Sequence, residues 1–424
     1  MLDIQFIRDN PNQVKQACVN KNLNSSLVGK LLKVDEKRRS LIPKVDKIKS
    51  RINNNAKKIK EQVAGGSKPS PELIQKGKDF KIQLKNQEPE LKEVEKEYRQ
   101  LMLEIPNVPA EDVPVGKDEE ENQIVRTEGN IPEFDFNVKD HQELMENLNL
   151  LDIKRGVKVA GFRGFFLKNQ GVLLEQAILN YAMELMASKG FSLMSAPTMV
   201  NKDALVGTGY FPWGKEDHYV TQDGQLLTGT SEVAVTSYHA GEILSEKDLP
   251  IQMTALSPCF RREVGSYGKD TKGIIRVHQF NKVEQVVYTV ADEEETIKWH
   301  EKMLGFSEEL LQNLGLPYQV LLMCTGDMGA GQRKKYDIET WFPSQQKYRE
   351  THSASYFLDF QSRRLNIRYQ AKDGKMKYVY TLNNTVAATP RLLAAIVENN
   401  QRADGSIVVP EVLRRWINQE VIQK

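Results

Sequence analysis

Apolar residues recur at three- and four-residue spacing over two long stretches near the N-terminus. The first stretch is interrupted at Asn55 and carries Leu41, Val45, Ile48, Ile52, Ile59 and Val63. The second is interrupted at Gln87 and carries Leu73, Phe80, Leu84, Leu91, Val94, Tyr98 and Leu101. Such a stripe is buried only against another helix, and the intervening segment 65–71 is rich in Gly, Ser and Pro, which is typical of a turn. Residues 27–104 are therefore predicted to form an antiparallel helical hairpin with arms roughly 50 Å long.

Prolines mark both this hairpin and its end. Pro43 and Pro89 lie inside the predicted helices, where proline removes a hydrogen bond and costs about 3 kcal/mol, so a kink or a break is expected before each. The segment 105–116 contains further prolines and cannot form a helix or a central strand, so it is predicted to be a linker. We therefore expect an N-terminal domain over residues 1–110 and a second domain over residues 111–424.

From about residue 140 the pattern changes to mixed helices and strands. The segment 173–186 has the pattern of an amphipathic helix. Runs typical of strands lie near 195–200, 226–228, 251–262, 274–290, 319–324, 337–342 and 378–382. These strands do not alternate regularly with helices, which favours an α+β fold with a mixed, mainly antiparallel sheet flanked by helices over a doubly wound parallel sheet.

Composition excludes several classes of protein. The chain has 424 residues, 40% hydrophobic and 27% charged, which is ordinary for a globular protein with two or three domains. No apolar run is long enough to span a bilayer, and no secretory signal is visible at the N-terminus. The three cysteines are far apart, so neither a disulfide framework nor a zinc site is expected. A reducing cytoplasm is the simplest location.

Charge is distributed unevenly over the predicted hairpin. Residues 30–63 contain 12 Lys and Arg against 4 Asp and Glu, whereas residues 72–104 contain 7 against 8. A basic helix beside a neutral one gives the hairpin one positive face. The alternative is an ordinary coiled coil for oligomerisation, but the asymmetry favours contact with the phosphates of RNA.

The segments 260–263 and 276–284 carry the clearest candidate chemistry. They suggest two strands joined by a glycine-bearing loop, with arginines, carboxylates and aromatic rings in a short span. Arg261 is suited to a phosphate, Phe280 to stacking on a base, and Glu263 to accepting from an amine. The alternative is a solvated charged strand face, although several charges on a buried strand are costly unless each is satisfied.

A second nucleotide motif is excluded. The segment 209–216 resembles a phosphate-binding loop, but Glu216 stands where a Ser or Thr would hold the metal, and Pro212 removes a backbone donor. The candidate nucleotide site therefore rests on the segments around Arg261 and Phe280.

Taken together, these segments resemble the seryl-tRNA synthetases, a family of class II aminoacyl-tRNA synthetases, over nearly the whole chain. The segments 190–197, 260–284 and 383–391 are similar to the three class II motifs. The helical hairpin and the segments 113–119, 139–141, 325–329 and 359–368 are also similar to the family. The departures are the motif 3 sequence Val386 to Arg391, which lacks the usual glycines, Ser231 in place of alanine, and His352 in place of serine.

The resemblance implies roles for individual residues. Arg261 would hold the α-phosphate of ATP, Glu263 and Phe280 would bind adenine, and Arg391 would cover its other face and contact the γ-phosphate. Other residues implied for ATP are Arg262, Glu350, Thr351, His352 and Ser353. Glu350 and Ser353 would hold Mg²⁺ through ATP, and no zinc is expected. The implied serine-binding residues are Thr230, Ser231, Glu232, Glu284, Asn383 and Thr385. The simpler readings are helix capping for Thr385 and salt bridges for Glu284 and Glu350.

The resemblance also implies the function. The expected enzyme is a serine–tRNA ligase that activates L-serine with ATP and transfers it to tRNA(Ser), with tRNA(Sec) as an open question. A cytoplasmic homodimer joined through motif 1 around Pro197 is expected, with the hairpin reaching the tRNA across the dimer. The alternatives are an amino-acid ligase acting on a carrier protein and a catalytically silent RNA-binding or regulatory homologue.

Overall fold

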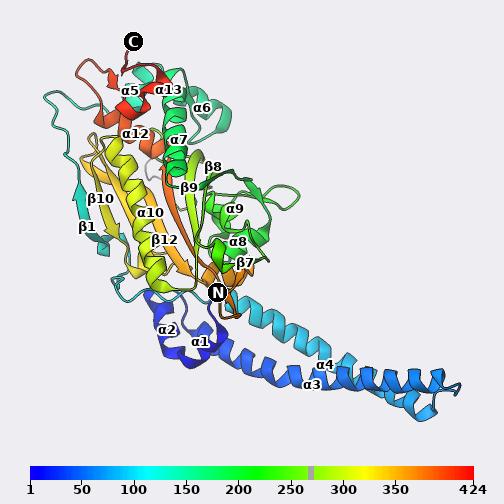
Figure 1. Ribbon diagram of the computed structural model, residues 1–424. Helices are drawn as coiled ribbons and strands as arrows, with labels where there is room; N and C mark the ends of the chain where they lie inside the picture. The colour runs from blue at the N-terminus through cyan, green and yellow to red at the C-terminus, as the bar shows by residue number, and fades with distance from the viewer. Residues whose placement is uncertain (266–271) are drawn as a thin grey trace. The chain divides into compact units, whose positions relative to one another are not determined.

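The computed structural model of the protein describes residues 1–265 and 272–424. The chain forms two compact units, one comprising residues 2–19 and 23–106, and the other comprising Met1, residues 20–22 and residues 107–424. Each unit has its own fold (Figure 1). Among the described residues, none of the helices combines the length and the apolar content needed to cross a bilayer.

The N-terminal unit contains the predicted helical hairpin. Short helices α1 (Ile4–Asp9) and α2 (Pro11–Asn20) precede the long helices α3 (Ser26–Ala64) and α4 (Pro71–Glu104). The side chain of Ser70 caps α4 by accepting a hydrogen bond from the amide of Leu73. The apolar stripe is buried between the arms at Leu41, Val45, Leu91 and Val94. The coiled-coil arm predicted from the periodicity is thus confirmed.

Two details of the hairpin differ from the sequence-based expectation. Of the kink or break expected before Pro43 and Pro89, the break does not occur, because α3 and α4, which lie wholly in the described part of the chain, run through the two prolines as continuous helices. Asn55 does not interrupt the contact between the arms, since its side chain is buried and donates to the carbonyl of Leu73 at 2.9 Å. A buried polar side chain with a partner is compatible with a continuous interface.

The second unit is built around an eight-stranded sheet with the order β1-β10-β11-β12-β15-β9-β8-β4. Every neighbouring pair is antiparallel except β4 and β8, which are parallel. The strands are β1 (Gln123–Glu128), β4 (Ser192–Ser195), β8 (Ile251–Phe260), β9 (Gln279–Thr289), β10 (Tyr318–Leu322), β11 (Lys334–Phe342), β12 (Lys347–Leu358) and β15 (Tyr380–Ala388). This is the predicted α+β class with a mixed, mainly antiparallel sheet.

Helices cover the sheet and fix which side chains face the candidate site. The main helices are α5 (His141–Asn147), α7 (Gln170–Ser188), α10 (Glu293–Asn313) and α12 (Thr389–Asn399). Helix α10 lies along one face of the sheet (Figure 1), where the side chains of Gln285 and Asn384 donate to the carbonyl of Met303. Because side chains alternate along a strand, the preceding residues Glu284 and Asn383 face the opposite side.

Short elements complete the second unit. The helices are α6 (Ile153–Ala160), α8 (Lys202–Thr208), α9 (Glu232–Thr236), α11 (Phe360–Leu365) and α13 (Arg414–Ile417). The strands are β2 (Leu151–Asp152), β3 (Phe166–Leu167), β5 (Met199–Val200), β6 (Leu226–Leu227), β7 (Ile243–Ser245), β13 (Arg368–Gln370), β14 (Met376–Tyr378), β16 (Ile407–Val408) and β17 (Val421–Ile422). The sequence pattern missed β12, the longest strand of the main sheet.

Candidate active site

One cavity of about 280 Å³ gathers most of the predicted site residues. It opens over the sheet at β9, β11, β12 and β15 and at the N-terminal end of α12. The predicted residues that line it are Glu232, Arg261, Glu263, Phe280, Glu284, Glu350, Thr351, His352, Ser353, Asn383, Thr385 and Arg391. Residues far apart in the sequence therefore meet at a single polar cavity.

Arg261 follows directly after β8 and is fixed by its backbone and its side chain. Its amide donates to the carbonyl of His278 at 3.0 Å, across the loop that joins β8 to β9. Its Nε donates to the carbonyl of Gly229 at 3.3 Å, and its guanidinium carbon lies 5.2 Å from the ring centroid of Phe280. A guanidinium held against an aromatic ring places a cationic group and a stacking surface side by side.

Glu263 and Arg276 close one end of the cavity. Arg276 donates to Glu263 Oε2 at 2.6 Å, so the two limbs of the β8–β9 loop are joined by an ion pair. Glu263 adopts a positive φ of 56°, a conformation that few residues other than glycine adopt. The ion pair and the backbone turn both orient the carboxylate at the cavity wall.

Glu350 and Arg391 form an ion pair at the wall of the cavity. Arg391 donates to Glu350 Oε2 at 3.0 Å and to its backbone carbonyl at 2.7 Å. Burial acts to raise the pKa of Glu350, but the positive charges of Arg391, Lys335 and Arg261 outweigh it and lower the pKa to about 2. Glu350 is therefore a carboxylate at neutral pH.

A bulge in β12 explains why four consecutive residues reach the same cavity. The register between β11 and β12 shifts between Ile338 and Glu339, which leaves Thr351 without a partner between Glu350 and His352. Bulges re-aim side chains and are common beside active sites. The carboxylate of Glu350 and the hydroxyl of Ser353 both line the cavity as a result.

Two buried carboxylates form the other end of the cavity. Glu232 accepts from Tyr210 at 2.8 Å and from Gln361 at 2.9 Å. Burial raises the pKa of Glu232 to about 7, and the negative charge of Glu284 adds to the shift. Burial also raises the pKa of Glu284, although Lys282, whose Nζ lies 2.6 Å from its carboxylate, opposes this. Two acidic side chains therefore share one small, buried region.

Three predicted residues do not line the cavity. The hydroxyl of Thr230 accepts from the amide of Glu232 at 3.2 Å, and Ser231 shares a hydrogen bond with Ser257 at 2.7 Å. Arg262 instead donates to the backbone carbonyl of Glu216 at 2.9 Å, since successive side chains of an extended chain point in opposite directions. The assignment of these three residues to substrate binding stays a prediction.

His352 lines the cavity, but both of its ring nitrogens are engaged. Nε2 lies 3.0 Å from the carbonyl of Val386, and Nδ1 lies 2.9 Å from the hydroxyl of Thr351. Burial lowers the pKa of His352 to about 4, so the ring is neutral at physiological pH. Its contacts join β12 to β15, and this explains how histidine is accommodated where the family often has serine.

Sequence reasoning missed several residues that line the cavity, most of them polar. They are Tyr210, Ile275, Arg276, Val277, Lys282, Gln332, Lys335, Ala388 and Pro390. Lys282 could have been predicted from the sequence, because it lies midway between Phe280 and Glu284 and alternate residues of a strand face the same side. Tyr210 lies in the segment 209–216, which was excluded as a phosphate-binding loop, and Lys335 comes from a strand that no motif singled out.

Comparison with known proteins places both units in one family. Residues 1–109 match the seryl-tRNA synthetase N-terminal domain, and residues 219–400 match the core domain of class II tRNA synthetases for glycine, histidine, proline, serine and threonine. A serine–tRNA ligase of Deinococcus radiodurans is 46% identical over 98% of this chain and 97% of its own length.

Solved structures agree with this placement. The seryl-tRNA synthetase of Pyrococcus horikoshii complexed with ATP has a TM-score of 0.89 and 38% identity, covering 100% of this chain and 99% of that one. The cytoplasmic serine–tRNA ligase of Naegleria fowleri in complex with AMP has a TM-score of 0.86 and 34% identity, with the same coverage. The chain belongs to the seryl-tRNA synthetase family of class II aminoacyl-tRNA synthetases.

Proposed function

We propose that the protein is an ATP-dependent serine–tRNA ligase, which forms seryl-adenylate and transfers the seryl group to the 3′ end of tRNA(Ser). The observation that carries this proposal is one cavity lined both by the arginines Arg261 and Arg391 and by the buried carboxylates of Glu232 and Glu284. Such a cavity suits a triphosphate beside a small ammonium-bearing substrate.

The proposed chemistry needs no protein nucleophile. The serine carboxylate attacks the α-phosphorus of ATP in line, the bond to the bridging oxygen breaks, and pyrophosphate leaves. Arg261 binds the α-phosphate and Arg391 the γ-phosphate, so that negative charge developing in the transition state is stabilised. Adenine stacks on Phe280, and the Glu263 carboxylate accepts from its amino group. Positioning and charge neutralisation together account for the acceleration of the step.

Serine recognition is assigned to the acidic end. Glu232 and Glu284 attract the ammonium group, while the hydroxyl of Thr385 lies 3.4 Å from the carboxylate of Glu284. Asn383 lines the same region and supplies a further polar partner for the substrate hydroxyl. Alanine would leave these polar groups unpaired, and threonine would add a methyl group to a confined space.

Mg²⁺ is proposed as the partner of the phosphates. The ion prefers oxygen ligands and is commonly held by one or two protein groups together with substrate phosphates. The ionised Glu350 and the hydroxyl of Ser353, which the β12 bulge brings to one cavity, fit that donor set. When bound, the ion would neutralise charge on the triphosphate.

We also propose the wider organisation of the enzyme. Residues 1–110 would form the tRNA-binding domain and residues 111–424 the catalytic domain. A homodimer would form through motif 1 around Pro197, where the edge strand β4 and the adjoining β5 expose Leu193 and Met199. A cytoplasmic location suits the three cysteines, all of them described, because none forms a disulfide.

Amino-acid-dependent exchange of pyrophosphate into ATP tests the proposed function. We expect serine alone among the twenty amino acids to support rapid exchange, and purified tRNA(Ser) to be charged with serine. A carrier-protein ligase would show serine-dependent exchange without charging tRNA, and a silent homologue would show no exchange. Either result would contradict the proposal.

The raised pKa of Glu232 predicts a pH dependence of serine binding. Below pH 7 this carboxyl is largely protonated in the free enzyme, so the KM for serine is expected to rise as the pH falls from 8 to 6. Glu232→Gln should raise this KM at pH 8 by about 10- to 100-fold and flatten its pH dependence, because a charge-assisted hydrogen bond is lost. The KM for ATP, measured in parallel, is expected to change little.

The same substitution, which is expected to weaken serine binding, is expected to increase the stability of the fold. The folded-state pKa of Glu232, about 7, lies above the ordinary value of 4.5, so its contribution to stability falls as the pH rises between these values. Glu232→Gln is therefore expected to stabilise the fold at pH 8, by up to about 3 kcal/mol. Thermal unfolding at pH 5 and pH 8 measures this; equal changes at both pH values would contradict the assignment.

A further inference from the structure

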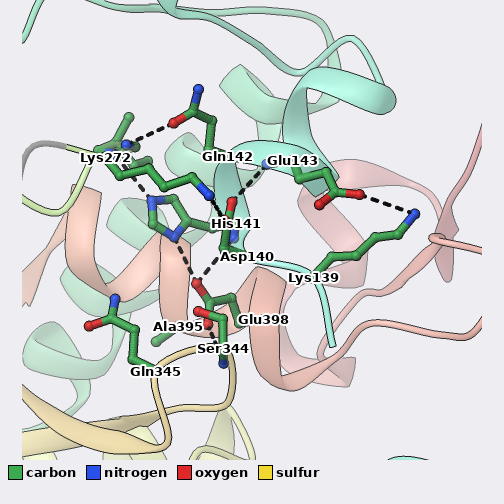
Figure 2. Close-up of polar contacts among 12 residues, drawn as sticks. Lys139, Asp140, His141, Gln142, Glu143, Lys272, Ser344, Gln345, Ala395 and Glu398 are labelled. Atoms are coloured by element: carbon green, nitrogen blue, oxygen red, sulfur yellow. Dashed lines mark hydrogen bonds and ion pairs between the residues drawn. The ribbon is translucent and has the colours of Figure 1, made fainter. Parts of the chain in front are cut away.

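Residues 140–142, at the start of α5, contact the returning limb of the β8–β9 loop (Figure 2). Lys272 forms an ion pair with Asp140, and the amide of Gly273 donates to Gln142 Oε1 at 3.0 Å. The amide of Ile274 donates to His141 Nε2 at 3.1 Å. Three successive residues of the loop are thus held by the start of α5.

The hydrogen bonds of His141 define its tautomer. A backbone amide can only donate, so Nε2 accepts from Ile274 and carries no proton. Nδ1 lies 2.8 Å from Glu398 Oε1 and must therefore carry the proton that it donates. His141 is consequently a neutral ring that links a buried carboxylate to a loop amide.

Glu398 is the fixed point of this network. It lies near the C-terminal end of α12, is fully buried, and also accepts from the amides of His141 and Ser344 at 3.1 Å each. A buried carboxylate with several donors is held in one orientation. The orientation of the His141 ring is fixed in turn.

Gly273 fits this contact because it has no side chain. Its φ is +69°, and a Cβ atom at this position would lie 1.9 Å from His141 Nε2. Only glycine allows the loop to approach the ring so closely. The sequence Gly273-Ile274 and His141 are therefore matched to each other.

The hydrogen-bond network of His141 and Glu398 is connected to the residues that line the cavity. Arg391, at the other end of α12, donates to the carbonyl of Ile275 at 3.2 Å. The segment 274–275 is thus attached to α12 twice, once through Arg391 and once through His141 and Glu398. The next residue, Arg276, lines the cavity and pairs with Glu263.

We propose that His141 is a positioning residue for the nucleotide, which holds the segment 274–276 against α12 so that Arg276 and Glu263 are in place before ATP binds. The proposal rests on the assignment of this cavity to ATP. When fewer molecules have the loop in place, the apparent affinity for ATP falls in proportion, whereas the rate at saturating ATP is restored.

Two substitutions separate this role from a purely structural one. The side-chain oxygen of Gln is separated from Cβ by as many bonds as Nε2 is in His. His141→Gln therefore keeps an acceptor for the amide of Ile274. The amide of Asn corresponds to Nδ1, so His141→Asn keeps a donor for Glu398 and leaves the Ile274 amide unpaired. We expect His141→Asn to raise the KM for ATP by about 10-fold with kcat changed less than about 2-fold. For His141→Gln we expect a lowered Tm but a KM for ATP closer to that of the wild type, because the backbone amide at this position still donates to Glu398 and keeps the start of α5 attached to α12.

The measurements are pyrophosphate exchange at saturating serine and thermal unfolding of both variants. Equal KM values for ATP in the two variants would overturn the proposal. A measurement on the wild type does not depend on the variants folding: without ATP, the amides of Gly273 and Ile274, which donate to Gln142 and His141, should be protected from hydrogen exchange. Rapid exchange of these two amides would overturn the proposal. Wild-type protein lacking serine-dependent exchange would instead contradict the proposed function.

Discussion

Arg261→Ala is expected to abolish serine-dependent pyrophosphate exchange while leaving the fold intact. The guanidinium stabilises charge on the α-phosphate, and removal of one preorganised group of this kind lowers kcat by about 10²–10³-fold, or more when the group is charged. Arg261 also rests on Phe280, so its loss disturbs the neighbouring base site. We expect kcat/KM for ATP to fall by at least about 10³-fold.

Arg261→Lys is the matched control for this prediction. Lysine keeps the positive charge but lacks the planar fork, so it should recover part of the activity without restoring the wild-type rate. Arg262→Ala removes a neighbouring cation that donates to Glu216 outside the cavity, and it should leave exchange within about 3-fold of the wild type. Full exchange by Arg261→Ala, or equal losses in the Arg261 and Arg262 variants, would contradict the assignment.

The hairpin was predictable because its residues follow one rule throughout. The three-four spacing of apolar residues is a local property. Together with the turn between the arms, it predicted the first and last residues of α3 and α4 to within one residue. The same rule misjudged Asn55, which is buried with a hydrogen-bond partner in the other arm. A periodicity argument identifies the buried face but does not detect a polar residue satisfied across it.

The strands of the main sheet could be predicted where they are apolar, but not where they contribute polar residues to the candidate site. Strand β12 begins Lys-Tyr-Arg-Glu-Thr-His-Ser, and it was missed because this half of the strand is polar, with Glu350 to Ser353 lining the cavity. Functional residues commonly break the local hydrophobic pattern. The bulge at Thr351 is also invisible in the sequence, because it arises from the register with β11.

The candidate site was predictable as a set of motifs but not as a set of side chains. Consecutive residues received one role in the sequence-based assignment, yet Arg262 turns away from the cavity while Arg261 and Glu263 line it. Lys282 was overlooked although it pairs with Glu284. Which neighbour faces the substrate depends on strand direction and on contacts with distant segments, and neither is encoded locally.

Removal of the hairpin is expected to spare serine activation and to cripple tRNA charging. Replacing residues 27–104 by a short Gly-Ser link leaves every residue that lines the cavity in place. The bases of the two arms lie together, as the 3.0 Å ion pair of Lys30 with Glu97 indicates, so a short link can join the ends. We expect pyrophosphate exchange within about 3-fold of the wild type and kcat/KM for tRNA lowered by at least about 100-fold, because phosphate contacts dominate affinity for nucleic acid.

Lysine substitutions on the two arms of the hairpin test whether the basic face of α3 attracts the tRNA. Near the base of the hairpin, cations of α3 pair with carboxylates of α4, as Lys37 does with Glu90 at 2.8 Å. Near the tip, Lys57, Lys58 and Lys60 are exposed, and no ion pair joins them to another described residue. The triple alanine variant of these tip lysines should weaken tRNA binding and lessen its salt dependence by up to about 2 in the slope of log K against log salt. Removing Lys78, Lys81 and Lys85 from α4 takes away the same charge from the neutral arm and should have a smaller effect. Equal effects of the two triple variants would mean that net charge, rather than the basic face of α3, attracts the tRNA.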